Sequence, residues 1–276
     1  FMDALDIFPA AGIRFIPVAH EQGAVHMADG YARISGRHGV CIGQNGPGVT
    51  NFVTGLAAAY WAHSPVVMIT PETGSMTMGL GGFQETEQLP IFSKITKYQA
   101  HVMNPRRMAE LTARAFDRAL LEMGPTQVNI PRDFFYGDIE CEIPKPIRVK
   151  LGAGSEKAIE DAADLLAKAK FPVILAGGGC RKAGPELQSL AEATGAPVVL
   201  TSNARGLMHK HPLAIPASPS LNAVRKLVHD ADLVIVAGSE LGPTDYDMYG
   251  TGPFEIAQQR LIRIDIDGAQ LARHNA

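Results

Sequence analysis

The chain has 276 residues, of which 46% are hydrophobic and 19% are charged, and its formal net charge is −3. At roughly 150 residues per domain, this length predicts about two domains, and the composition excludes a disordered, collagen-like or disulfide-stapled protein. The small net charge gives no electrostatic reason to expect nucleic acid or an anionic membrane as a partner.

Short apolar runs bounded by Gly, Pro or polar turns alternate along the chain with helical patterns. Several runs are continuously apolar, which is typical of parallel strands covered on both faces. The predicted strands are 14–18, 39–43, 66–70, 126–130, 172–176, 197–200, 233–237 and 261–266. The predicted helices are 22–34, 49–62, 105–123, 156–169, 185–193 and 220–229. This rhythm predicts an α/β fold of two successive doubly wound parallel-sheet domains.

The rhythm is interrupted in the middle of the chain. Segment 138–154 contains two prolines, two glycines and mixed charges, and Ser155 follows as a helix N-cap with Glu156 in the first turn. We predict a first domain over 1–140, a linker over 141–154 and a second domain over 155–276. The second domain ends soon after a strand, so we expect it to be truncated.

Three cysteines, Cys41, Cys141 and Cys180, lie far apart in the sequence and form no CxxC pair. This favours a reducing, cytoplasmic compartment, with the cysteines as buried small hydrophobic residues. The apolar runs are far shorter than the ~20 residues of a membrane helix, and we recognise no signal peptide. We therefore expect no membrane partner.

The first candidate site residue is Glu21, which follows the predicted strand 14–18 at the start of a helix. In open α/β sheets, ligands bind outside the carboxyl ends of the strands, where Glu21 is expected. Apolar neighbours would desolvate its carboxyl group and raise the pKa. Alternatively, Glu21 is an ordinary acidic residue stabilised by the helix dipole.

Two glycine-rich segments follow the next two strands and point to the same sheet edge. The turn Gly46-Pro47-Gly48-Val49-Thr50-Asn51 allows a ligand to approach the backbone, and the loop 74–85 carries Phe83 and Gln84. Considered separately, the first segment could equally be a simple turn and the second a surface loop, with no ligand at either. Their convergence on one edge strengthens the case for a site.

The second domain offers weaker signals. Gly177-Gly178-Gly179 follows a strand, but Lys182 occupies the third glycine position of a GxGxxG nucleotide motif, so a tight turn is the simpler interpretation. Asp265 and Asp267 end another strand, where they would contact a ribose or simply form a turn. The nine histidines form no clear metal set.

Together, HEQGAVHMADGYAR (20–33), GPGVTN (46–51) and GGFQE (81–85) resemble the pyrimidine-binding domain of thiamine-diphosphate enzymes of the acetolactate synthase type. Residues 155–276 resemble the Rossmann-like central domain of the same family through the GGG turn and LIRIDID (261–267). The resemblance covers the whole chain. It implies thiamine diphosphate and Mg²⁺ as cofactors.

The resemblance also assigns roles to individual residues. Glu21 matches the glutamate that hydrogen-bonds N1′ of the aminopyrimidine and takes part in its proton exchange, so it is the first catalytic candidate. Pro47 and Asn51 match pocket residues beside the pyrimidine. Gln84, the second catalytic candidate, and Phe83 match the loop that reaches toward the reacting carbonyl carbon. Arg106, Arg107 and Lys97 are candidates for anion binding by charge alone.

Within the family, the chain resembles the branch that converts sulfoacetaldehyde and phosphate into acetyl phosphate and sulfite. An acetolactate synthase, a 2-oxoacid decarboxylase and a non-catalytic subunit or binding module are the alternatives. The resemblance implies a homodimer or homotetramer, a helix and strand ahead of Phe1, and a third domain whose GDG motif holds Mg²⁺ and the diphosphate. Because the sequence has no GDG, we expect the isolated chain to be inactive.

Overall fold

The computed structural model describes residues 7–146, 152–246, 252, 254, 256, 257 and 260–272. It divides into two compact units, Phe1–Val149 and Lys150–Ala276, and each is an α/β unit built on a parallel sheet. Among the described residues, every helix is too short or too polar to span a lipid bilayer.

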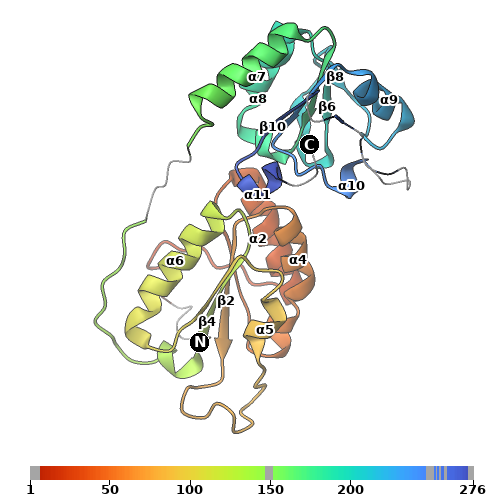
Figure 1. The fold of residues 1–276 in the computed structure, drawn as a ribbon. Coiled ribbons are helices and arrows are strands. Elements are labelled where there is room, and N and C mark those ends of the chain that lie inside the picture. Colours follow the sequence, from red (N-terminus) through yellow and green to blue (C-terminus); the bar gives the residue numbers. More distant parts are fainter. Residues whose placement is uncertain are drawn as a thin grey trace. The chain divides into compact units, whose positions relative to one another are not determined.

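The first unit contains a four-stranded parallel sheet with the order β1-β2-β4-β3. Its strands are β1 (Gly39–Ile42), β2 (Val66–Glu72), β3 (Tyr98–His101) and β4 (Thr126–Pro131). Its helices are α2 (Glu21–Ser35), α3 (Pro47–Thr50), α4 (Val53–Trp61), α5 (Gln88–Phe92), η1 (Pro105–Arg107), α6 (Met108–Leu121) and η2 (Arg132–Phe135). Figure 1 shows α6 on one face of this sheet and α2 and α4 on the other.

The alternation of side chains along β2 explains why both faces of this sheet are covered. Val66 and Met68 pack in one buried cluster with residues of α2 and α4, whereas Val67 packs with residues of α6 in another. A strand with apolar side chains on both faces cannot be left open to water on either side. The continuous apolar run in the sequence therefore predicts the layers correctly.

The second unit has a five-stranded parallel sheet with the order β10-β9-β5-β6-β8. Its strands are β5 (Pro172–Ala176), β6 (Val198–Leu200), β7 (Arg205–Met208, outside this sheet), β8 (Ala214–Ile215), β9 (Leu233–Ala237) and β10 (Leu261–Ile264). Its helices are α7 (Glu156–Lys168), η3 (Gly178–Lys182), α8 (Gly184–Thr194), η4 (Ser202–Ala204), α9 (Asn222–Asp230), α10 (Pro243–Tyr246) and α11 (Gly268–Leu271). The Ser155 hydroxyl caps α7 by accepting a hydrogen bond from the Ala158 amide, as predicted.

The predicted strand 14–18 is wrong, because these residues form no strand in the described part of the chain. Phe15 and Ile16 are 42% and 47% exposed, and Pro17 has no backbone N–H to donate to a ladder. An apolar run becomes a strand only where a neighbouring strand pairs with it. Glu21 consequently lies at the start of α2 but not at the end of a strand.

Other elements also differ from the sequence-based prediction, which did not include α5, β7, β8, α10 or α11. Strand β3 (Tyr98–His101) was missed because two of its four residues are polar. The predicted helix 49–62 is divided into α3 and α4, with Asn51 as the C-cap of α3. The remaining predicted strands are present, and their ends lie within two residues of the prediction.

The three cysteines are unpaired thiols in two different environments. Cys41 and Cys180 are buried, and burial raises the pKa of Cys41 to about 12. Cys141 is exposed, so the expectation that all three are buried is wrong for this residue.

Candidate functional site

Glu21 lies in the first turn of α2, and His20 caps the helix by accepting a hydrogen bond from the Gln22 amide. The Asn51 side chain donates a hydrogen bond of 2.9 Å from Nδ2 to Glu21 Oε2. This hydrogen bond lowers the pKa of Glu21 and outweighs the opposing effect of desolvation. The raised pKa expected from apolar neighbours is therefore wrong, and the carboxyl group is ionised at neutral pH.

The turn that follows β1 brings its glycines against the other two segments. A Cβ atom at Gly48 would lie 3.1 Å from Glu21 Oε1, so the absence of a side chain leaves room beside this carboxylate oxygen. Gly46 has φ +70°, and a Cβ atom there would lie 2.5 Å from the Gln84 carbonyl oxygen. Pro47 stands between them at the start of α3.

The loop after β2 is bound to the same turn. Asn45 Nδ2 donates hydrogen bonds to the carbonyl oxygens of Phe83 (3.1 Å) and Gln84 (3.2 Å), and Gln44 Nε2 donates to Gln84 Oε1. Phe83 is 74% exposed. The structure thus brings the start of α2, the Gly46–Pro47–Gly48 turn and the Phe83–Gln84 loop together.

The loop is ordered by one of its own carboxylates. Glu85 accepts hydrogen bonds from the amides of Gly79 and Gly82, and these bonds hold the pKa of Glu85 below its ordinary value. Gln84 beside it has a positive φ of +53°, a conformation uncommon for residues other than glycine. The loop is therefore a defined structure, and the Gln84 backbone is strained within it.

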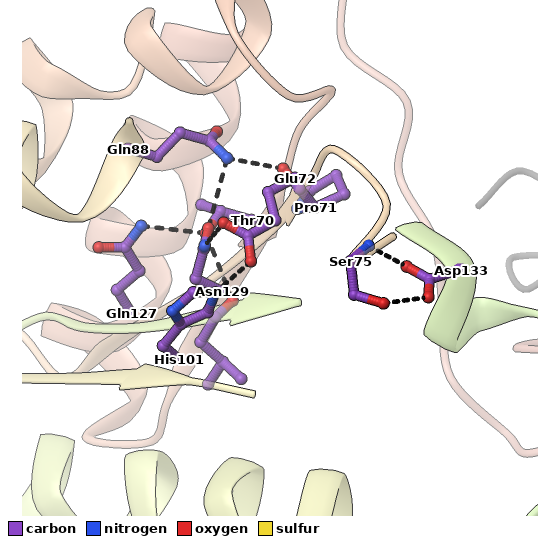
Figure 2. A network of polar contacts seen from close by, with 10 residues as sticks. Thr70, Pro71, Glu72, Ser75, Gln88, His101, Gln127, Asn129 and Asp133 are labelled. Carbon is purple, nitrogen blue, oxygen red and sulfur yellow. Dashed lines mark hydrogen bonds and ion pairs between the residues drawn. The ribbon is translucent and has the colours of Figure 1, made fainter. Parts of the chain in front are cut away.

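A polar network on neighbouring strands of the same sheet was not predicted from the sequence (Figure 2). The network residues are Thr70, Glu72, Gln88, Gln99, His101, Gln127 and Asn129. Four of them, Thr70, Gln88, Gln127 and Asn129, are at most 1% exposed. The sequence does carry a signal, since the six strand residues occupy alternate positions in three strands and therefore share one face. The shared face could not be recognised from the sequence, because the strand β3, which carries Gln99 and His101, was not predicted.

In the second unit, the glycines pack backbone against backbone. A Cβ atom at Gly177 would lie 2.1 Å from the Gly238 carbonyl oxygen, and one at Gly179 would lie 2.8 Å from the Gly238 Cα. The amides of Gly177 and Gly179 also donate to the carbonyls of Ala237 and Gly238. These contacts support the tight-turn interpretation of the GGG segment. Asp267 likewise caps α11 through the Ala269 amide.

The cationic candidates lie elsewhere. Lys97 precedes β3, at the opposite edge of the sheet from the site, and its ammonium group lies 4.6 Å from the centroid of the Tyr60 ring. Arg107 forms an exposed ion pair with Glu110 at 2.8 Å. Arg106 is in the same short η1 helix. Among the described residues, no cluster of three His, Cys, Asp or Glu side chains is arranged to bind a metal ion.

Two protein-family models match the chain. The model described as thiamine pyrophosphate enzyme, N-terminal TPP binding domain, matches residues 1–91. The model described as thiamine pyrophosphate enzyme, central domain, matches residues 159–276. Thiamine pyrophosphate is another name for thiamine diphosphate.

Curated relatives extend this likeness. Sulfoacetaldehyde acetyltransferase of Alcaligenes xylosoxydans xylosoxydans is 63% identical over 98% of the chain and 46% of that protein. The enzyme of the same name from Castellaniella defragrans is 52% identical, with the same two coverages. The acetolactate synthase large subunit of Corynebacterium glutamicum is 34% identical over 97% of the chain and 44% of that protein. The chain thus spans about half the length of the curated relatives it matches.

Proposed function

The chain belongs to the thiamine pyrophosphate enzyme family, and from this premise we propose that it forms the pyrimidine-binding and central domains of a thiamine-diphosphate-dependent acyltransferase. The proposed reaction converts sulfoacetaldehyde and phosphate into acetyl phosphate and sulfite. The observation that carries the choice of substrate is the identity of 63% over 98% of the chain to a sulfoacetaldehyde acetyltransferase. Identity to the acetolactate synthase large subunit is much lower, at 34%.

The geometry at the start of α2 fits the aminopyrimidine of this cofactor. Such a ring needs a carboxylate at its N1′ atom, and Glu21 Oε1 faces the unsubstituted Cα of Gly48 while Oε2 is held by Asn51. The lowered pKa keeps the Glu21 carboxylate ionised, so that it can accept a hydrogen bond from a protonated N1′ atom at this position. We therefore propose Glu21, Pro47 and Asn51 as residues of the pyrimidine pocket.

When bound, thiamine diphosphate supplies a carbon nucleophile and an electron sink for the two-carbon unit. In the proposed site, Gln84 orients the carbonyl group of the substrate. Its Oε1 atom accepts from Gln44, which leaves the amide NH₂ group as the donor for a substrate oxygen. The exposed Phe83 ring would cover the reacting group and keep water from it.

We also propose that the protein acts in the cytoplasm as a homodimer or homotetramer, with Mg²⁺ bound to the cofactor's diphosphate. The three unpaired thiols are consistent with a reducing compartment. Light scattering of the holoenzyme measures the assembly, and a monomeric mass would contradict this part of the proposal.

Substrate discrimination tests the proposed reaction. The holoenzyme, supplied with thiamine diphosphate and Mg²⁺, is expected to release sulfite from sulfoacetaldehyde only when phosphate is present, with one acetyl phosphate formed per sulfite. Release of carbon dioxide from pyruvate without sulfite formation would favour the acetolactate synthase or decarboxylase alternative. Absence of both reactions, together with failure to bind the cofactor, would favour a non-catalytic module.

A further inference from the structure

The buried side chain of Gln88 connects the two ends of the loop that carries Gln84. The loop, residues 73–87, leaves the sheet after β2 and returns at Gln88, the first residue of α5. Gln88 is 1% exposed, and its Nε2 atom donates a hydrogen bond of 2.8 Å to the carbonyl oxygen of Pro71 in β2 (Figure 2). Any displacement of Gln88 therefore moves the end of the loop relative to its beginning.

Asn129 connects Gln88 to the end of β2. Its Oδ1 atom accepts from Gln88 Nε2 at 3.3 Å and from the Thr70 hydroxyl at 2.7 Å, and its Nδ2 group donates to Glu72 Oε2. Asn129 is fully buried. Because a buried amide that loses a partner leaves an unsatisfied polar group, its orientation is strongly fixed by these three contacts.

Glu72 extends the chain of contacts to the edge of the sheet. Its second carboxylate oxygen, Oε1, accepts from Nε2 of His101, the last residue of the edge strand β3. The two side chains are only 11% and 27% exposed. Register explains the alignment, since Thr70 and His101 both lie opposite Asn129 on the strands that flank β4.

A second set of hydrogen bonds holds the loop near its start, between Ser75 and Asp133. The Ser75 amide and hydroxyl donate to the two carboxylate oxygens of Asp133 at 2.7 and 2.6 Å (Figure 2). Asp133 belongs to η2, directly after β4. Strand β4 therefore connects the two ends of the loop through Asn129, and η2, which follows β4 directly, holds the loop near its start through Asp133.

We propose that Glu72, His101, Asn129 and Gln88 form a latch that sets the position of loop 73–87, so that Glu72 and His101 are positioning residues that act through Gln84. This inference rests on the proposed function for the part that concerns turnover. Packing alone would be served equally well by apolar side chains, whereas hydrogen bonds fix direction. The polar row thus gives the loop one geometry.

Amide hydrogen exchange of the holoenzyme tests the latch without any assay of activity. Glu72→Gln keeps the shape of the side chain but replaces one acceptor oxygen by a donor, and His101→Phe removes the donor to Glu72. Loss of one such hydrogen bond is expected to speed exchange in residues 73–87 by about tenfold, with α6 unchanged.

His38→Phe is the matched control. His38 donates to the Phe116 carbonyl oxygen at 2.8 Å and contacts the Phe116 ring, so the same substitution removes one hydrogen bond of a partly buried histidine that contacts α6. It is expected to leave loop exchange unchanged. Unchanged loop exchange in both latch variants, or an equal increase in α6, would overturn the proposal, because the network would then be irrelevant or merely stabilising.

A double-mutant cycle tests whether the latch acts through Gln84. Glu72→Gln is expected to lower kcat/KM about tenfold in the wild-type background, and to have no further effect in a Gln84→Ala background. Equal losses in both backgrounds would contradict a positioning role. If the enzyme releases no sulfite, the proposed function fails, while the exchange comparison still decides the latch.

Discussion

Each of the two units has a glycine-rich turn directly after a buried parallel strand, yet the two turns meet different partners. In the first unit, Gly48 faces the Glu21 carboxylate, whereas in the second unit Gly177 and Gly179 face the backbone of Gly238. The same residue type therefore makes space for a side-chain carboxylate in one place and for another turn in the other.

This difference limits what can be inferred about function from a glycine-rich turn in the sequence. A turn of this kind indicates close approach, and the approaching atoms differ between the two turns. At Gly48 they include an ionised carboxylate held by Asn51. At Gly177 the closest atom is a carbonyl oxygen of the neighbouring turn, and the amide already donates to the Ala237 carbonyl.

The largest expected effect comes from removing the carboxylate. Glu21→Gln should lower kcat/KM for sulfite release by about 10²–10⁴-fold, because a general acid–base group is lost, while the free energy of unfolding changes little. Glu186→Gln, in the first turn of α8, is the control for an acidic residue at a helix N-terminus. A Glu21→Gln enzyme within threefold of the wild-type rate would contradict the proposed role.

The next effect is on stability. Gly177→Ala should lower the free energy of unfolding by about 2–3 kcal/mol, because its Cβ atom meets a backbone oxygen that cannot move without shifting β9. Gly184→Ala in the same unit meets only Leu207 Cδ2 at 3.5 Å and is the control. Urea unfolding measures both. Equal stability of the two variants would show that the backbone contact at Gly177 does not restrict this position.

In contrast to Gly177→Ala, the substitution Gly48→Ala is expected to affect activity more than stability. The closest atoms to the new Cβ atom are Gln44 Cβ and Glu21 Oε1, both at 3.1 Å, and side chains can give way by a few tenths of an ångström. We expect a loss of less than about 1 kcal/mol in stability but about a tenfold fall in kcat/KM as the carboxylate is displaced. A loss of stability as large as that of Gly177→Ala would show that both turns are structural.

The smallest effect concerns pH. The hydrogen bond from Asn51 lowers the pKa of Glu21 in the folded state. This hydrogen bond therefore stabilises the fold at pH values above the pKa of Glu21 in the unfolded state, and its contribution is lost as the pH falls through the pKa of the folded state. Asn51→Ala should therefore lower the free energy of unfolding at pH 7, by less than about 1 kcal/mol for this part-buried pair. The deficit should narrow below about pH 4. A deficit that is constant with pH would contradict the hydrogen bond as its cause.

Much of the fold was predictable because apolar runs such as 172–176 and 233–237 leave a buried parallel strand as the simplest interpretation. The same logic failed for 14–18, which is apolar but unpaired, and for β3, which is polar but paired. Strand formation depends on the partner strand, and a partner distant in the sequence is invisible to local patterns.

For the candidate site, the sequence predicted which segments meet but not how they interact. Glu21 and Asn51 are 30 residues apart, and the direction of the Glu21 pKa depends on the hydrogen bond between them. Local apolar neighbours suggested the opposite direction. The latch was missed for a related reason, since Glu72 and His101 are joined only by the order of β2, β4 and β3.

The backbone of Gln84 has a consequence for protein engineering. At a φ of +53°, the backbone conformation of Gln84 costs about 1 kcal/mol more for glutamine than for glycine. Gln84→Gly is therefore expected to raise the free energy of unfolding and, if Gln84 has the role proposed above, to lower kcat/KM at the same time.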